Sequence, residues 1–253
     1  VVALLCAAGS NDIHARSGNE LADALAGQLA RTAPSADPGV IGLGTHALAC
    51  AKSIGAVADT HTLAVIDYSR PSTLPRLWVF DLQRKTLLFE EWVAHGRNTG
   101  ANLAVKFSND AGSLMSSIGA FVTGDTYEGH NGYSLRLNGL DAGFNDHALA
   151  RAIVFHGASY VSANLIQDQG RLGRSFGCPA VRPEVAHRLI DAIRDGAFVF
   201  AYYPDPDWME KSRYLGNCGG EASAPAGAGI AHRQIASVAR RPRTPCDLRA
   251  AWR

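Results

Sequence analysis

Residues 152–181 read AIVFHGASYVSANLIQDQGRLGRSFGCPAV, and the interpretation of the whole chain depends on this stretch. Its first residues, Ala152–Phe155, are apolar and include two β-branched side chains, which predicts a short buried strand ending at His156 and Gly157. The polar segment that starts at Asp168 contains three glycines, which predict tight turns. The sequence therefore places Cys178 in a bend.

The residues after the bend predict a helix. Pro183 and Glu184 are typical of a helix start, Gly196 of a helix end, and four apolar residues between them share one face: Val185, Leu189, Ile190 and Ile193. The positive end of this helix is expected to favour the thiolate of Cys178, together with three nearby arginines, Arg171, Arg174 and Arg182.

A thiolate beside an imidazole is the minimum machinery for acyl transfer. His156 would take the proton, the sulfur of Cys178 would attack a carbonyl, and the backbone N–H groups of Gly177 and Cys178 would hold the oxyanion. On residue types alone, a buried structural thiol and a core histidine remain open alternatives.

Several motifs carry a family resemblance. F-H-G-A-S-Y-V-S at 155–162 and G-R-L-G-R-S-F-G-C-P-A-V at 170–181 resemble the catalytic signature of murein L,D-transpeptidases, the YkuD-type cysteine enzymes, and most closely the branch whose motif ends in G-C-P-A. Four upstream segments resemble the same branch: Trp78–Leu82, Val93–Gly96, Phe107–Asn109 and Gly112–Gly119. The resemblance extends over 63–203.

This resemblance implies a mainly β catalytic domain with a few helices, an L,D-transpeptidase-like β-sandwich or barrel. It makes Cys178 the nucleophile and His156 its general base, oriented by the backbone carbonyl of Gly157. One residue departs from the family pattern, because Phe176 stands where the second histidine is usual. Phenylalanine cannot donate a hydrogen bond, so any role of that histidine is absent here or moved to another residue.

By the same resemblance the substrate is a peptidoglycan stem peptide, and the product is a cross-link or, with water as acceptor, a trimmed stem. Arg174, Arg171, Ser175 and Tyr160 are expected to bind it; Arg174 lies nearest the cysteine and is the first candidate for the donor's terminal carboxylate, with Arg182 as a further one. No cofactor and no metal are required, and susceptibility to carbapenems is expected. A cysteine hydrolase of cell-wall peptides and a noncatalytic peptidoglycan-binding module remain alternatives.

Composition fits one catalytic domain with appendages. The 253 residues are 47% hydrophobic and 19% charged, which suffices for one sizeable core. A formal net charge of +1 favours neither a nucleic-acid binder nor a polybasic membrane protein. No apolar run has the length of a membrane span.

Four segments follow along the chain. Residues 1–17 are expected to be a partial secretory signal or disordered, since 1–10 lack Met and end in small residues; a truncated fragment is the alternative. Residues 18–58 predict two helices, at 19–30 and 44–57, interrupted by Pro34, Pro38 and Gly39. Residues 59–206 form the catalytic domain, and 207–253 a disordered basic tail. Export to the periplasm or the extracellular envelope would suit the substrate.

Within the catalytic domain, alternation predicts strands at 62–68, 133–138 and 197–203 and a hairpin of 77–80 with 87–93. His95 and Asn109 either line the site or belong to solvated loops. His46 and Cys50 lie one helical turn apart, where a packed helix face is favoured over a metal site. Cys50, Cys218 and Cys246 have no framework spacing, although Cys218 and Cys246 could pair across the tail.

Overall fold

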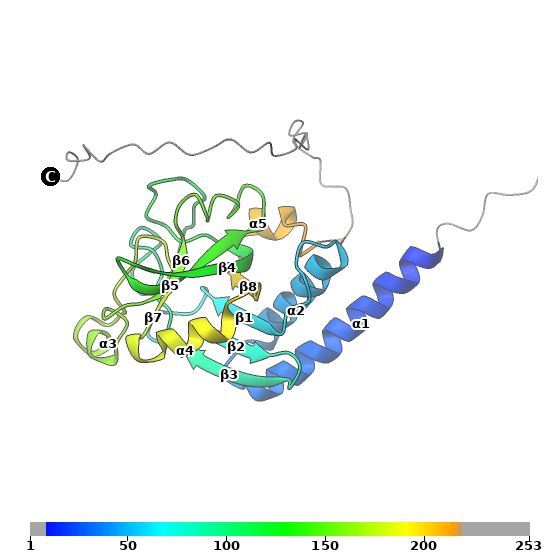
Figure 1. The fold of residues 1–253 in the computed structure, drawn as a ribbon, viewed down its shortest axis with the longest axis horizontal. Coiled ribbons are helices and arrows are strands. Elements are labelled where there is room, and N and C mark those ends of the chain that lie inside the picture. The colour runs from blue at the N-terminus through cyan, green and yellow to red at the C-terminus, as the bar shows by residue number, and fades with distance from the viewer. Residues whose placement is uncertain (1–8, 217, 219–253) are drawn as a thin grey trace, which may run out of the picture. The chain divides into compact units, whose positions relative to one another are not determined.

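The computed structural model describes residues 9–216 and 218. Its centre is an eight-stranded sheet in the order β3-β2-β1-β8-β4-β5-β6-β7 (Figure 1). Pairing is parallel between β1 and β8 and between β6 and β7, and antiparallel elsewhere. The strands are β1 (Thr62–Asp67), β2 (Leu77–Asp81), β3 (Thr86–Glu91), β4 (Gly119–Gly129), β5 (Gly132–Gly139), β6 (Val154–Gly157), β7 (Ala180–Val181) and β8 (Phe198–Tyr202).

The two edges of this sheet approach each other. The chain that leaves β3 forms a bridge between Ala94 and Ala180 of β7, and the N–H of Ser175 donates to the carbonyl of His95 at 3.0 Å. These bonds occupy backbone groups that an open edge would leave unpaired, so the sheet bends toward a barrel. The predicted mainly β domain is confirmed, as are the strands at 62–68, 133–138 and 197–203 and the β2–β3 hairpin.

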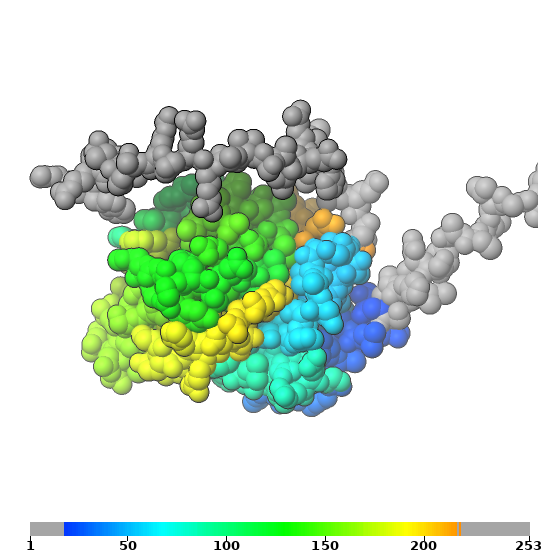
Figure 2. All heavy atoms as spheres, in the orientation of Figure 1, coloured from blue at the N-terminus to red at the C-terminus, as the bar shows by residue number. Residues whose placement is uncertain are grey.

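Five helices lie among the described residues: α1 (Gly9–Thr32), α2 (Pro38–Ser53), α3 (Ala163–Gln169), α4 (Pro183–Ile193) and α5 (Pro206–Lys211). The first two pack on each other and contact β1 and β3, as Figure 1 shows. Figure 2 shows α4, in yellow, crossing the visible face beside β4 and β5, in green. On its other face α4 buries its apolar stripe, including Leu189 and Ile193, as the sequence predicted.

Helix α2 begins six residues earlier than the sequence predicted. Asp37 caps it by accepting from the N–H of Gly39 at 2.7 Å, and Pro38 occupies the first helical position, where its missing N–H costs no hydrogen bond. The proline and glycine that were taken as interruptions are thus the helix start. A Cβ on Gly44 would meet Phe200 and Val65 at 3.3 Å, so this glycine allows α2 to lie close to the sheet.

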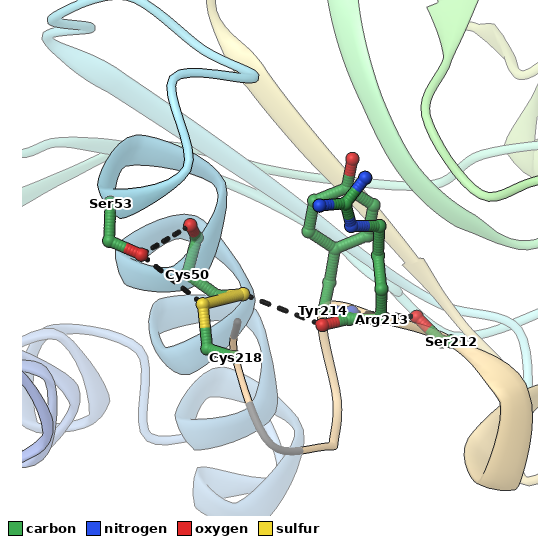
Figure 3. Close-up of a disulfide and its surroundings, with 6 residues drawn as sticks. All are labelled: Cys50, Ser53, Ser212, Arg213, Tyr214 and Cys218. Atoms are coloured by element: carbon green, nitrogen blue, oxygen red, sulfur yellow. Dashed lines mark hydrogen bonds between the residues drawn. A yellow bond between two sulfur atoms is a disulfide. The ribbon is translucent and has the colours of Figure 1, made fainter. Parts of the chain in front are cut away.

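The segment after β8 belongs to the domain. A disordered tail was predicted from 207 onward, whereas α5 runs to Lys211 and its Trp208 is fully buried. Cys218 forms a disulfide with Cys50 of α2, with a Cα–Cα distance of 5.4 Å, rather than pairing with Cys246 (Figure 3). The hydroxyl of Ser53 lies 3.2 Å from the sulfur of Cys218. Cys246, the rest of the predicted tail, and the N-terminal residues 1–8 of the predicted signal lie outside the described residues.

Candidate active site

His156 is held at the end of β6, opposite Ser134 of β5 and Ala180 of β7. Its Nδ1 lies 3.0 Å from the carbonyl oxygen of Gly157. Because a carbonyl can only accept, Nδ1 carries the proton and Nε2 keeps its lone pair. Burial lowers the pKa of His156, so the ring is neutral at pH 7 and can accept a proton at Nε2.

The bend that carries Cys178 is fixed by a backbone conformation that only glycine adopts readily. Gly177 has φ +129°, and a Cβ there would lie 2.8 Å from the carbonyl oxygen of Met115 and 2.9 Å from Cδ1 of Ile153. Below the bend, Ser116 Oγ donates to the carbonyl of Gly177 at 3.0 Å. The chain then enters β7 at Ala180, which pairs with His156, so the cysteine and the histidine lie on neighbouring segments of the sheet.

The thiol of Cys178 is half-buried, and its Sγ lies 3.7 Å from the carbonyl oxygen of Ala152. Burial raises the pKa of this thiol, and only smaller effects lower it, among them the positive charge of Arg151. The resting thiol is therefore protonated at neutral pH, so a reaction at this sulfur would need a neighbouring base. The charges of Arg171, Arg174 and Arg182, which were expected to favour the thiolate, are not among the effects that lower the pKa of this thiol, and desolvation outweighs the effects that do.

Three residues predicted for the site are committed to other partners. Arg182 forms a two-pronged ion pair with Glu91, at 2.9 and 2.7 Å, and is not available to a substrate. Ser175 is buried; its Oγ donates to the carbonyl of Cys178 at 2.6 Å and accepts from the N–H of Gly177 at 3.1 Å. Ser175 therefore shapes the bend, and the N–H predicted as an oxyanion donor at Gly177 is already occupied. Of the two N–H groups predicted to hold an oxyanion, only that of Cys178 remains a candidate.

Arg174 and Arg171 lie in the loop that leads to the bend. One nitrogen of Arg174 donates to the carbonyls of Arg97 and Gly100, each at 3.0 Å, and one of Arg171 donates to its neighbour Leu172 at 2.8 Å. Burial lowers the pKa of Arg174, and the charges of Arg171 and Arg97 lower it further. Among the residues that the structure describes, no carboxylate forms an ion pair with any of these three arginines. They form a cationic cluster beside the bend.

Two aromatic rings border this region. Tyr160 meets His156 edge-to-face, with 6.5 Å between ring centroids, and burial raises its pKa. Phe176 is 67% exposed, and the guanidinium of Arg97 lies over its ring, 5.9 Å from the centroid. The residue at the position of the usual histidine thus points outward to solvent and to a cation.

Arg151 lies at the site although the sequence motifs did not predict it. It precedes the quoted stretch by one position, and its guanidinium donates to the carbonyls of Ser108 and Met115 and to the hydroxyls of Ser113 and Ser117. The sequence feature that could have predicted it is a single arginine directly before an apolar strand, because burying a charge there costs free energy unless the charged group is hydrogen-bonded.

His95 and Asn109 were expected either to line the site or to belong to solvated loops, and each of them is bonded to another side chain. His95 is buried, and its Nδ1 lies 2.8 Å from Nη2 of the fully buried Arg76. Burial and the charge of Arg76 lower the pKa of His95 to about 3, so it serves as a neutral acceptor. Asn109 donates to Asp146 at 2.7 Å in an exposed loop.

His46 is bonded to Asp23 at 2.7 Å, on the surface shared by α1 and α2. Within the described residues, no group of three or more His, Cys, Asp or Glu side chains could hold a metal ion. Over that same range no helix has the length and apolar character that crossing a membrane requires.

The comparisons with known proteins assign the family. The sequence model of the L,D-transpeptidase catalytic domain, YkuD_2, matches residues 33–202. The chain therefore belongs to this family, which confirms the resemblance drawn from the motifs. The match begins within the segment of α1 and α2, so part of the predicted helical segment belongs to the family's domain.

Individual solved structures are more distant. An L,D-transpeptidase from Mycobacterium smegmatis is 13% identical, with a TM-score of 0.36; the alignment covers 56% of this chain and 59% of that one. An L,D-transpeptidase (Yku) from Stackebrandtia nassauensis is 16% identical, with a TM-score of 0.36 and coverage of 74% and 93%. The transpeptidase LdtMt1, solved in complex with imipenem, is 15% identical, with a TM-score of 0.35 and coverage of 56% and 59%. The comparison with curated proteins finds no match.

Proposed function

We propose that this protein is a cysteine-dependent L,D-transpeptidase of the cell envelope that acts on peptidoglycan stem peptides. The observation that carries the proposal is the pairing of His156 with Ala180, which brings a histidine with a free Nε2 next to the bend that presents Cys178. Membership of the family gives that arrangement its chemical meaning. The proposed location is periplasmic or extracellular, where this substrate lies.

In the first half-reaction, Nε2 of His156 takes the proton of the Cys178 thiol as the sulfur attacks the carbonyl at the L-centre of the third stem residue. The N–H of Cys178 donates to the oxyanion that forms. When the tetrahedral intermediate collapses, the carbon–nitrogen bond breaks and the imidazolium returns its proton to the departing amine of D-Ala. A thioester on Cys178 remains.

In the second half-reaction, His156 takes a proton from the attacking nucleophile, and the thiolate of Cys178 leaves. An amine of a neighbouring stem gives a cross-link, whereas water gives carboxypeptidase activity. The carbonyl of Gly157 holds the imidazole in one tautomer throughout, because it bonds only the Nδ1–H.

The cationic cluster supports the assignment of the donor end. A stem peptide that ends in D-Ala carries a carboxylate one residue beyond the attacked carbonyl, and Arg174 and Arg171 lie in the loop just before Cys178. Since Arg97, Arg171 and Arg174 lack carboxylate partners among the described residues, an anionic ligand would relieve their mutual repulsion. Arg presents a fork that suits a carboxylate. Tyr160 borders His156 and forms a wall of the proposed site.

The test is intact-mass analysis of purified wild type and Cys178→Ala after incubation with a carbapenem. We expect one adduct per wild-type molecule and none on Cys178→Ala, which would establish an acyl-accepting thiol. A folded wild-type protein that gains no adduct yet still binds isolated sacculi would replace this proposal with a noncatalytic binding module.

Transfer is separated from hydrolysis by the products. Wild type incubated with a tetrapeptide donor and an amine acceptor should release D-Ala and form the amide of donor and acceptor. Release of D-Ala with no amide product at any acceptor concentration would identify a cysteine hydrolase instead. In the same assay Arg174→Ala should raise the donor concentration needed for half-maximal rate; an unchanged value would remove Arg174 from the donor site.

A further inference from the structure

Arg151 is held beside the thiol by the turn that leads into β6. The N–H of Arg151 donates to the carbonyl of His147 at 2.9 Å, and the next residue, Ala152, adopts a left-handed conformation with φ +53°. Such a conformation is uncommon for a residue with a side chain and is kept where the surrounding structure enforces it. In this conformation the carbonyl oxygen of Ala152 lies 3.7 Å from Sγ of Cys178. Arg151, the residue before Ala152, is therefore close to the thiol along the chain.

The guanidinium of Arg151 is half-buried and bonded to neutral groups. Nη1 donates to the carbonyl of Ser108 and to Ser117 Oγ, each at 2.6 Å; Nη2 donates to Ser113 Oγ at 3.0 Å and to the carbonyl of Met115 at 2.7 Å. Within the described part of the chain no carboxylate forms an ion pair with it. A cation removed from water usually has an anionic partner, because neutral groups only partly replace its hydration.

The charge of Arg151 lies next to the reacting bend, and the nearest carboxylate that acts on it, Asp110, raises its pKa without forming an ion pair within the described residues. A Cβ on Gly177 would lie 3.5 Å from Nη2 of Arg151 and 2.8 Å from the Met115 carbonyl that Nη2 binds. Negative charge arises here twice in the proposed reaction, first on the sulfur and then on the oxyanion. Phe176, which is exposed and has no hydrogen-bond donor in its side chain, cannot stabilise either.

We propose that Arg151 supplies a fixed positive charge that stabilises the thiolate of Cys178 and the anionic intermediate formed at its sulfur. This inference rests on the proposed function, in which Cys178 is the nucleophile. The electrostatics agree with it: the charge of Arg151 lowers the pKa of the thiol against the opposing effect of burial, and Cys178 in turn raises the pKa of Arg151. Arg151 acts at the moment of attack, since burial keeps the resting thiol protonated.

The experiment measures the apparent pKa of the Cys178 thiol. The rate of iodoacetamide alkylation is followed against pH, and peptide mass spectrometry assigns the modification to Cys178; Cys178→Ala gives the background. Arg151→Gln should raise the apparent pKa by about one unit or more, the size expected when a nearby opposite charge is lost. Arg151→Lys, which keeps the charge, should stay close to wild type. A complete pH profile is needed because a thiolate of higher pKa is also intrinsically more nucleophilic.

Arg136→Gln is the matched control. Arg136 is also half-buried and lies over an aromatic ring, 4.1 Å from the centroid of Tyr127, but its charge is not among those that shift the pKa of Cys178. Its removal should leave the profile unchanged. A profile for Arg151→Gln that superimposes on that of Arg136→Gln would overturn the inference.

A second variant separates charge from bracing, because Arg151 also ties the segment 108–117 to the site. The double variant Ser113→Ala/Ser117→Ala removes two neutral partners and keeps the cation, so the apparent pKa should remain near that of wild type. A shift as large as that of Arg151→Gln would assign Arg151 a bracing role only. If Arg151→Gln does not fold, Arg151→Met takes its place as the neutral variant: a raised pKa supports the charge, and a wild-type pKa overturns it.

Alkylation needs no stem peptide, so this result is independent of the proposed reaction. A protein that shows the pKa shift but gains no carbapenem adduct would keep Arg151 and lose the transpeptidase assignment. A protein that gains the carbapenem adduct but shows no pKa shift would keep the transpeptidase assignment and lose the role of Arg151.

Discussion

Acid should destabilise this protein through His95, a residue outside the proposed reaction. The imidazole is buried and accepts from Arg76, and its pKa is lowered from 6.5 to about 3. Because the folded pKa lies below the unfolded one, the unfolded chain binds the extra proton first as pH falls. The stabilising effect is therefore complete above pH 6.5 and is lost as pH decreases from 6.5 toward 3. Protonating His95 in the folded state would place two positive charges 2.8 Å apart.

The magnitude follows from the difference between the two pKa values. Each pH unit below 6.5 costs about 1.4 kcal/mol until the folded group also titrates, so at pH 5.0 the loss is about 2 kcal/mol. Urea unfolding of wild type at pH 7.5 and pH 5.0 gives the total change, to which other groups contribute. His156, whose pKa burial also lowers, adds to the loss, whereas Asp67 and Asp141, whose pKa values burial raises, oppose it.

His95→Asn isolates the contribution, since its Oδ1 can still accept from Arg76 but does not titrate. The variant should lose about 2 kcal/mol less than wild type between pH 7.5 and 5.0. His130→Asn, at an exposed position of the β4–β5 hairpin, is the control and should follow wild type. Equal losses for wild type and His95→Asn would refute the argument.

Three further perturbations have defined outcomes. Replacing Cys50 and Cys218 by Ser opens a loop of 168 residues and should lower the free energy of unfolding by about 2–5 kcal/mol in denaturant melts without reductant; no change would mean that the loop is held without the bond. Gly177→Ala should lower the free energy of unfolding by about 1–3 kcal/mol and abolish the carbapenem adduct. Gly112 also has a positive φ, +72°, but no atom lies within 4 Å of its Cβ position, so Gly112→Ala should lower the free energy of unfolding by about 1 kcal/mol and keep the adduct. Glu91→Gln breaks the ion pair with Arg182 and should lower the free energy of unfolding by about 2 kcal/mol, less than for a fully buried pair, because the Arg182 side chain is 35% exposed. A smaller loss for Glu91→Gln than for Arg182→Lys, which keeps the charge, would contradict this.

Local patterns predicted the strands and α4 because their periodicity is imposed by the face each element buries. The alternation in β5 and the apolar run of β8 need no knowledge of distant partners. The start of α2 was missed because Pro38 was taken as an interruption, although a proline after a capping Asp is compatible with a helix start. Cys50 and Cys218 could not be paired from sequence, since 168 residues separate them and spacing carries no information on which cysteines meet.

The same distinction between local pattern and distant contact holds at the candidate site. The motif named Cys178 and His156, but the roles of their neighbours depend on bonds between distant segments. Ser116 accepts from the N–H of Gly96 at 3.0 Å and donates to the carbonyl of Gly177, joining three segments at the seam where the sheet closes. In the same region, the N–H of Gly177 donates to Ser175, and Arg182 pairs with Glu91. Arg151 is then the cation whose charge lowers the pKa of the thiol. Because the bend is completed by the closing edges of the sheet, a change at the seam should alter reactivity as well as stability.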